Sequence, residues 1–263
     1  MKNYSGNELA YELATNGFFV FKNVVNNETV DIAKTKLLEI YNSEINEYGD
    51  EFLKSTGELG QLRALILKDS FFEKFVRSDF INKILNDHLT PAAILHLING
   101  IVTKASVSHN QASFHRDFPK PFSSSRPLSL NIFYPLVDFD KKFGGTYFLP
   151  GSHKLEEFPS EEIIKNSAVQ INCSAGDVII FDSMLVHAGG KNSSDEVRFA
   201  INTQFTFPFI KQQIDLAEYY KSKKLHMDEE VEQRLGCWSI PPKSTKEFRF
   251  GKNGKRTYRS GQG

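Results

Sequence analysis

The chain has 263 residues, and its 32 lysine and arginine residues are balanced by 32 aspartate and glutamate residues. A neutral chain lacks the basic surface that nucleic-acid binding requires, and at this length it can bury a core without disulfides or structural metal. The two cysteines, Cys173 and Cys237, lie far apart, so neither a disulfide framework nor a thiolate zinc site is indicated.

No apolar run approaches the roughly 18 residues of a membrane helix, and the N-terminal residues resemble neither a signal sequence nor an arginine-rich transit peptide. We therefore expect a cytoplasmic protein with no membrane and no nucleic-acid partner. No repeat or low-complexity linker divides the chain, so residues 1–263 are expected to form a single domain. The sequence leaves the oligomeric state open.

Residues 1–92 show a mainly helical pattern, which predicts a helical layer packed against a sheet. The apolar run Gly17–Val25 interrupts this pattern and predicts a short strand. After Asn26 and Asn27, which are suitable N-caps, apolar residues recur with a period of about 3.6 and predict an amphipathic helix. Ser70 and Ser78 are each expected to cap a further short helix.

Between residues 93 and 210 the hydrophobic period changes to two. Apolar runs lie near 93–107, 127–137, 145–149, 168–172, 177–187 and 196–207. Glycine turns separate many of these runs, which favours a mainly β sandwich or barrel with flanking helices over repeated βαβ units. Residues 211–263 return to a polar helical pattern that extends to about residue 235, and a polar tail follows.

Three residues have the types and spacing of a metal site. His115 and Asp117 are two apart, and in a strand such residues point to the same face. His187 follows the apolar run VIIFDSMLV, which is expected to form one strand. Two imidazoles and one carboxylate form the facial triad that suits non-haem Fe(II).

Arg198 begins a strand with clean alternation. Apolar Val197, Phe199 and Ile201 fall on one face, whereas Arg198, Asn202 and Gln204 fall on the other. The polar face is either in water, as on an edge strand, or lines a cavity, and its closeness to His187 favours the cavity. Arginine offers a two-pronged donor for a carboxylate.

At this point the sequence resembles the phytanoyl-CoA dioxygenase-like Fe(II)/2-oxoglutarate oxygenases. The resemblance covers roughly residues 90–210. It rests on His115-Arg116-Asp117, on the segment GGTYFLPGSH from Gly144 to His153, on AGDV from Ala175 to Val178, and on His187 followed by Arg198. The fold that it implies is a double-stranded β-helix, a cupin-like jelly roll with helices on one side.

The resemblance also implies roles for individual residues. It makes His115, Asp117 and His187 the iron ligands and Arg198 the partner of the distal 2-oxoglutarate carboxylate. Further candidates for cosubstrate binding are Ser129, Asn131, Thr103 and Lys104. Candidates for substrate contact are His109, Gln111, Asn202 and Gln204, and the position of Asn202 and Gln204 on the pocket face indicates a polar substrate. Gly189 departs from the family, whose members often have a small hydroxyl residue at that position.

The other histidines are expected to be structural. His153 lies in the turn Pro150-Gly151-Ser152, where a backbone-capping role is favoured over a role as metal ligand. His88, His96 and His226 have no partner at ligand spacing.

The function implied is that of a 2-oxoglutarate-dependent dioxygenase of the EC 1.14.11 type, which uses Fe(II), 2-oxoglutarate and O2 to oxidise a small, polar metabolite. Hydroxylation is expected, not halogenation, because Asp117 fills the ligand position that related halogenases leave small. The alternatives are a non-oxidative jelly-roll metal enzyme, such as an isomerase or hydrolase, and a non-catalytic metal- or ligand-binding protein.

Overall fold

The computed structural model describes residues 6–104, 113–118, 124–140, 142–226 and 228–250. The helices are α1 (Gly6–Thr15), α2 (Asn27–Tyr48), α3 (Asp50–Ser55), α4 (Asp79–His88), α5 (Glu161–Ser167), α6 (Leu216–Ser222), α7 (Glu229–Arg234) and α8 (Thr245–Phe250). Short 3₁₀ helices are η1 (Leu65–Leu67), η2 (Ser70–Phe75) and η4 (Ser152–Lys154). The strands are β1 (Phe18–Phe21), β2 (Gln61–Leu62), β3 (Ile94–Thr103), β4 (Ser129–Pro135), β5 (Tyr147–Phe148), β6 (Val169–Gln170), β7 (Val178–Asp182), β8 (His187–Ala188) and β9 (Arg198–Thr206).

The strands form two antiparallel sheets. The larger has the order β1-β7-β4-β9-β3-β2 and the smaller the order β6-β5-β8. The sheets pack together through aromatic side chains, such as Phe148 of β5 and Phe181 of β7, whose ring centroids lie 5.0 Å apart. The expected jelly roll, mainly β with flanking helices, is confirmed.

Alternation along the central strands gives the larger sheet two different faces. On β4, Leu130 and Ile132 join the core beneath the helices, whereas Phe133 joins the core between the sheets. On β9, Ile201 likewise faces the helices and Ala200 faces the smaller sheet. Because side chains of a strand alternate between faces, the polar residues Asn131, Asn202 and Gln204 fall on the inner face, toward the smaller sheet.

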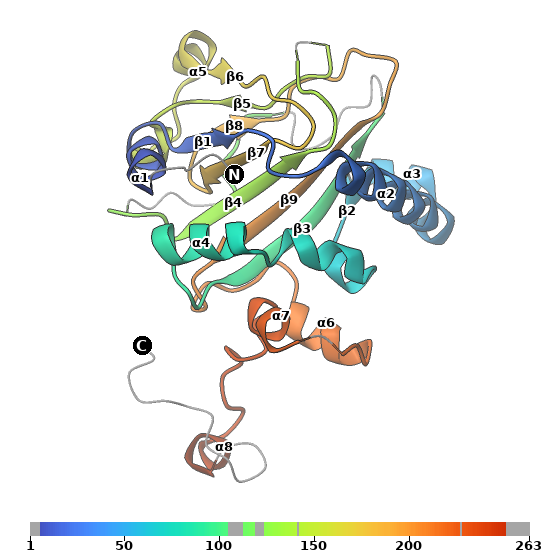
Figure 1. Cartoon of the computed structure of the whole chain (residues 1–263), viewed down its shortest axis with the longest axis vertical. Coiled ribbons are helices and arrows are strands. Elements are labelled where there is room, and N and C mark those ends of the chain that lie inside the picture. The colour runs from blue at the N-terminus through green and yellow to red at the C-terminus, as the bar shows by residue number, and fades with distance from the viewer. Residues whose placement is uncertain (1–5, 105–112, 119–123, 141, 227, 251–263) are drawn as a thin grey trace.

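Helices cover the outer face of the larger sheet. In Figure 1, α2 and α4 lie over this face, and α6 and α7 lie near the lower end of β3. The N-termini of α2 and α4 are capped as expected, since Asn26 accepts a hydrogen bond from the Thr29 amide and Ser78 accepts one from the Ile81 amide. Among the described residues, no helix is both long and apolar enough to span a bilayer.

Two local predictions were wrong. The helix near residue 70 is the 3₁₀ helix η2, and its cap is Asp69, which accepts from the Phe71 amide, not Ser70. The run 177–187 is not one strand either. β7 ends at Asp182, whose carboxylate accepts from the Met184 amide and so favours a turn, and His187 lies beyond this turn in the other sheet.

Candidate metal centre

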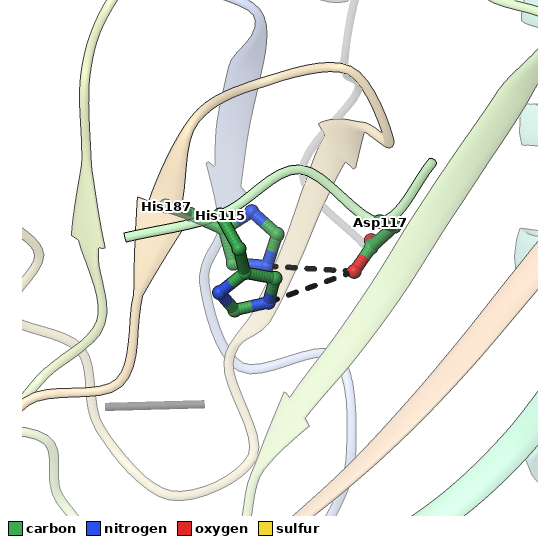
Figure 2. A group of neighbouring side chains, drawn as sticks. All are labelled: His115, Asp117 and His187. Atoms are coloured by element: carbon green, nitrogen blue, oxygen red, sulfur yellow. Dashed lines mark ion pairs between the residues drawn. The ribbon is translucent and has the colours of Figure 1, made fainter. Parts of the chain in front are cut away.

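His115, Asp117 and His187 meet at one point in the structure. One nitrogen or oxygen ligand atom from each lies within 4.8 Å of the others. The Oδ1 atom of Asp117 is 3.9 Å from Nε2 of His115 and 3.7 Å from Nε2 of His187. Figure 2 shows the two imidazoles side by side, with the carboxylate facing both. Among the described residues this is the one group with metal-ligand composition and spacing.

Backbone hydrogen bonds hold the two ligand-bearing segments together. The amide of His115 donates to the carbonyl of His187 at 2.9 Å, and the amide of His187 donates back to His115 at 3.0 Å. The amide of Asp117 donates to the carbonyl of Ser183 at 3.1 Å. The HxD segment is therefore paired to the turn between β7 and β8, which explains how residues far apart in sequence form one site.

Hydrogen bonds also orient both imidazole rings. Nδ1 of His115 lies 2.8 Å from the carbonyl of Ser113, and Nδ1 of His187 lies 2.9 Å from the carbonyl of Leu185. A carbonyl only accepts, so each Nδ1 carries the proton and each Nε2 presents a lone pair to the centre. Burial lowers the pKa of His187, which keeps this imidazole neutral as a metal ligand requires.

A buried polar network fixes the carboxylate. Nδ2 of Asn131 donates to Oδ2 of Asp117 at 2.7 Å and to the Ser183 hydroxyl at 2.9 Å. Nε2 of Gln204 donates to the hydroxyls of Ser183 and Ser129, each at 3.0 Å. Ser183 donates to Ser129 at 2.8 Å, and Ser129 donates to the carbonyl of Phe205 at 2.8 Å.

Every side-chain proton in this network has one acceptor. The two amide protons of Asn131, the two of Gln204 and one proton on each serine account for all six contacts in a single consistent direction. One proton of Asn131 goes to Oδ2 of Asp117, which leaves Oδ1 facing the imidazoles, and the other branch of the network ends on the carbonyl of Phe205.

The segment Pro150-Gly151-Ser152-His153 forms hydrogen bonds with both chain segments that carry the metal ligands. The Ser152 hydroxyl accepts from the amide of Val186, the residue before His187, at 2.8 Å. The guanidinium of Arg116, between the two HxD ligands, donates to the carbonyl of Ser152 at 3.3 Å and to that of Leu155 at 2.7 Å. This segment is therefore part of the scaffold of the centre.

His153 does not reach the metal centre. Its ring is half-buried against Gly17, where an added Cβ would lie 2.6 Å from Nδ1 of the histidine. Burial lowers the pKa of His153 to about 4, so the ring is neutral at physiological pH.

The glycine pair before β5 is explained by close backbone packing. A Cβ on Gly144 would lie 2.6 Å from the carbonyl carbon of Gly190, and a Cβ on Gly190 would lie 2.4 Å from the carbonyl oxygen of Gly145. Side chains at these positions would push apart the loop before β5 and the loop after β8. The loop that follows His187 thus stays against the smaller sheet.

Arg198 lies at the closed end of the site. Its side chain is buried, and Nη1 donates to the carbonyl of Gly190 at 3.1 Å. Its Cζ lies 4.3 Å from the centroid of the Phe139 ring. Burial lowers the pKa of Arg198 to about 10, so the guanidinium remains charged at neutral pH. Among the described residues it has no carboxylate partner, and Nε has no acceptor.

Two cavities meet at the triad. The inner cavity lies between the triad and Arg198. It is lined by Ile101, His115, Asp117, Phe133, Thr146, Phe181, His187, Gly189, Arg198 and Asn202. The outer cavity has a volume of about 350 Å³. It is lined by Gly57, Glu58, Gln61, Arg63, His96, Leu97, Asn99, Ile101, His115, Arg116, Asp117, Asn202, Gln204 and Gln213.

The other predicted site residues are distributed differently. Thr103 lies opposite Arg198 in the β3–β9 register, on the inner face, although it lines neither cavity. Ser129 and Asn131 lie behind Asp117 in the polar network and line neither cavity. The Lys104 ammonium lies 5.1 Å from the Tyr41 ring of α2, on the helical side of the sheet, so the structure does not support a place for it in the site. His109 and Gln111 lie outside the described residues.

Sequence reasoning missed several residues of the site. Ser183 could have been identified from the sequence, because it is a polar residue within a mainly apolar run. Gln61 and His96 were not, because they lie in β2 and at an irregularity in β3, and only the fold brings them beside the triad.

Comparisons with known proteins agree with this arrangement. A family model described as phytanoyl-CoA dioxygenase matches residues 13–200. An uncharacterised protein of Mycobacterium tuberculosis is 33% identical over 253 residues, which cover 94% of this chain and 92% of that protein. The dioxygenase hkm4 of Aspergillus hancockii is 28% identical over 186 residues, 65% of this chain and 60% of that protein. The iron/alpha-ketoglutarate-dependent dioxygenase ausO of Aspergillus calidoustus is 28% identical over 130 residues, 44% of each chain.

Solved structures share the fold. The non-haem monooxygenase ThoJ matches with a TM-score of 0.64 at 18% identity, covering 79% of this chain and 80% of that one. The epimerase SnoN, solved with Fe3+, alpha ketoglutarate and nogalamycin RO, matches with a TM-score of 0.59 at 19% identity, covering 77% of this chain and 84% of that one.

Proposed function

The chain belongs to the phytanoyl-CoA dioxygenase family, and we propose that it is an Fe(II)- and 2-oxoglutarate-dependent dioxygenase that oxidises a small, polar metabolite. The observation that carries this proposal is the triad His115, Asp117 and His187, set in a cavity whose other end is a buried arginine without a carboxylate partner among the described residues.

The donor set fits iron. Two imidazole nitrogens and one carboxylate oxygen converge, and the second nitrogen of each imidazole is held by a carbonyl. Such a set suits Fe(II) because it leaves coordination positions open for other ligands. No thiolate takes part, since Cys173 lies in the core between the sheets, where burial raises its pKa to about 12.

The charged end of the inner cavity is complementary to a carboxylate of 2-oxoglutarate. A charged guanidinium buried without a carboxylate is costly, and the distal carboxylate of the oxoacid supplies the missing partner through charge-assisted hydrogen bonds. Thr146, which also lines this cavity, offers a hydroxyl in the neighbourhood where family members often have one after the distal histidine. Here Gly189 leaves that place without a side chain.

The walls between the two ends are apolar. Ile101, Phe133 and Phe181 line the inner cavity and are buried in the core between the sheets. They keep water away from the reacting centre, which strengthens the pairing of Arg198 with a carboxylate. When bound, Fe(II) supplies the oxidative chemistry, in which O2 and 2-oxoglutarate are consumed and succinate, CO2 and an oxidised substrate are formed.

The test is oxygen-dependent formation of succinate by the purified protein loaded with Fe(II). We expect slow turnover of 2-oxoglutarate without substrate, lost on chelation of the iron. A metal-loaded protein that turns over substrate without O2 would be a non-oxidative isomerase or hydrolase. A protein that binds ligand without any turnover would be a non-catalytic binding protein.

A further inference from the structure

The outer cavity is the part of the site that faces away from Arg198. It shares Ile101, His115, Asp117 and Asn202 with the inner cavity, so a molecule bound there lies beside the metal ligands. The chemical class of this molecule can be inferred from the lining of the outer cavity, because some of the charged and hydrogen-bonding groups there are already paired and others are not.

The charged groups of the lining are satisfied by the protein itself. Arg63 donates through Nε and Nη2 to both oxygens of Glu58, at 2.8 and 2.6 Å. Nη1 of Arg63 donates to the side-chain Oε1 of Gln213 at 3.3 Å. Arg116 is turned toward the backbone carbonyls of residues 152–157, and Asp117 belongs to the metal centre. Nε of Arg116 is buried without an acceptor, but the described lining offers a ligand no unpaired carboxylate or ammonium.

Hydrogen-bond acceptors, in contrast, remain open. Oε1 of Gln61, Oδ1 of Asn202 and Nδ1 of His96 are buried and have no hydrogen-bond partner among the described residues. Burial lowers the pKa of His96, so its ring is a neutral acceptor at physiological pH. Buried acceptors left unpaired cost free energy, and a ligand that brings O–H donors removes this cost.

These open acceptors lie on one surface. Gln61 lies opposite Ile101, and Asn202 lies opposite Asn99, in the antiparallel registers of β2, β3 and β9. Side chains directly opposite one another share a face, so Gln61 and Asn202 are on the face that carries Arg198. His96 is the extra residue where the β3–β9 register shifts between Leu95 and Leu97, and such a bulge redirects a side chain.

We propose that the outer cavity binds a neutral, hydroxyl-rich ring, such as a glycosyl or cyclitol group, and presents one of its carbons to the metal centre. This proposal rests on the function proposed above and specifies its substrate class. A fatty acyl or aromatic group would bury the open acceptors without pairing them, and the apolar side chains of the described lining are few, Leu97 and Ile101. Among the described lining residues, the one cation without a carboxylate partner is Arg116, whose guanidinium already donates to backbone carbonyls, so a charged group would find little counter-charge there.

The cavity volume is consistent with this class. About 350 Å³ is at the small end of ligand sites, which suits a sugar or cyclitol unit better than a long chain.

The first test uses the Fe(II)-loaded protein with 2-oxoglutarate and O2. Succinate formation is measured with a panel of neutral methyl glycosides and cyclitols, and with matched panels of acyl-CoA thioesters, amino acids and organic acids. We expect stimulation above the substrate-free rate only in the first panel. Stimulation confined to another panel, or none by any glycoside or cyclitol while substrate-free turnover is present, overturns this inference and leaves the oxygenase assignment intact. If oxygen-dependent succinate formation itself is not seen, the proposed function fails.

The second test uses variants of the open acceptors. Gln61→Leu and Asn202→Leu should each raise the KM for the best glycoside about tenfold, which corresponds to about 1.4 kcal/mol. In Gln61→Leu the KM for 2-oxoglutarate should change much less, because Gln61 lines the outer cavity and not the inner one. The control is Asn86→Leu, on the exposed side of α4, which should change neither value.

Gln61→Glu provides a variant that keeps the shape of the side chain. A carboxylate at this position should shift preference from the neutral glycoside toward its amino-sugar analogue. Unchanged selectivity in Gln61→Glu, together with an unchanged KM in Asn202→Leu, would show that these side chains do not contact the substrate and would overturn the inference.

Discussion

The inner and outer parts of the site differ in how fully their polar groups are paired. Behind Asp117, every side-chain proton of Asn131, Gln204, Ser183 and Ser129 has an acceptor, although Oδ1 of Asn131 has no partner among the described residues. In the outer cavity, buried acceptors on Gln61, Asn202 and His96 have no partner among the described residues. A paired network holds one geometry, whereas unpaired groups await a ligand. We therefore expect the first region to position the metal ligands and the second to contact the substrate.

Arg198 stands between these two cases. It is held in place by Gly190 and by the Phe139 ring, yet part of its guanidinium has no partner among the described residues. The guanidinium is thus held in one position, as the metal ligands are, and it still has a donor free for a ligand. An anionic cosubstrate that binds in one orientation requires both properties.

The largest effect is expected for the metal ligands. His187→Ala removes one of the two imidazoles, so the variant should lose tightly bound iron and all measurable turnover while it keeps its fold. Iron analysis after gel filtration and circular dichroism provide the measurement. His226→Ala, at an exposed position outside the site, is the matched control and should retain iron. Normal iron content and turnover in His187→Ala would place the centre elsewhere.

Arg198→Gln should act on the cosubstrate. Each charged hydrogen bond that is lost is worth about 1.5 to 3 kcal/mol, so the KM for 2-oxoglutarate should rise by about tenfold to 100-fold or more. The iron requirement should change little, because Arg198 contacts none of the triad. Titration of succinate formation against 2-oxoglutarate measures the effect, with Arg249→Ala, on an exposed turn of α8, as control. An unchanged titration curve would contradict the assignment.

A smaller effect on metal binding is expected for a side chain that contacts a metal ligand and not the metal itself. Asn131→Leu removes the donor to Oδ2 of Asp117, and loss of such outer hydrogen bonds weakens metal affinity about 10-fold to 100-fold. Anaerobic titration with Fe(II) measures this, and thermal unfolding reports any loss of stability. The exposed Asn172→Leu serves as control. If Asn131→Leu binds iron like the wild type, the network does not position the carboxylate, and the contrast between the two regions is weaker than described.

The sequence predicted the first region far better than the second. His115, Asp117, His187 and Arg198 lie in motifs whose order and spacing along the chain carry the information, and the structure brings all four together. The alternation after Arg198 correctly placed Asn202 and Gln204 on the face of the cavities. Such patterns can be recognised from the sequence alone, because they depend on strand periodicity, which the local sequence determines.

The remaining residues depend on tertiary pairing. Asn131, a candidate for cosubstrate binding, donates to Asp117 and to Ser183, and Ser183 reaches this place only through the turn after β7. Lys104, next to Thr103, alternates to the helical side of the sheet, where it lies over Tyr41. Gln61 comes from a two-residue strand within a segment read as helical, and no local pattern identifies so short an element.

Chloride is expected to have no effect on the reaction, which makes this the smallest of the predicted effects. A halide can bind the metal centre only if a ligand position is vacant, and the position that matters is held by Asp117. Its Oδ2 accepts from Asn131 at 2.7 Å, its backbone amide donates to the carbonyl of Ser183, and Oδ1 faces the two imidazoles, so one side-chain and one backbone hydrogen bond hold this residue in place. We therefore expect the same rate of succinate formation in chloride and in sulfate buffers, with a substrate product that is heavier by one oxygen atom or otherwise oxidised. Mass spectrometry of the product distinguishes these outcomes. A chlorinated product from the wild-type chain would mean that the network does not keep Asp117 in place, and the paired region would then be as adaptable as the unpaired one.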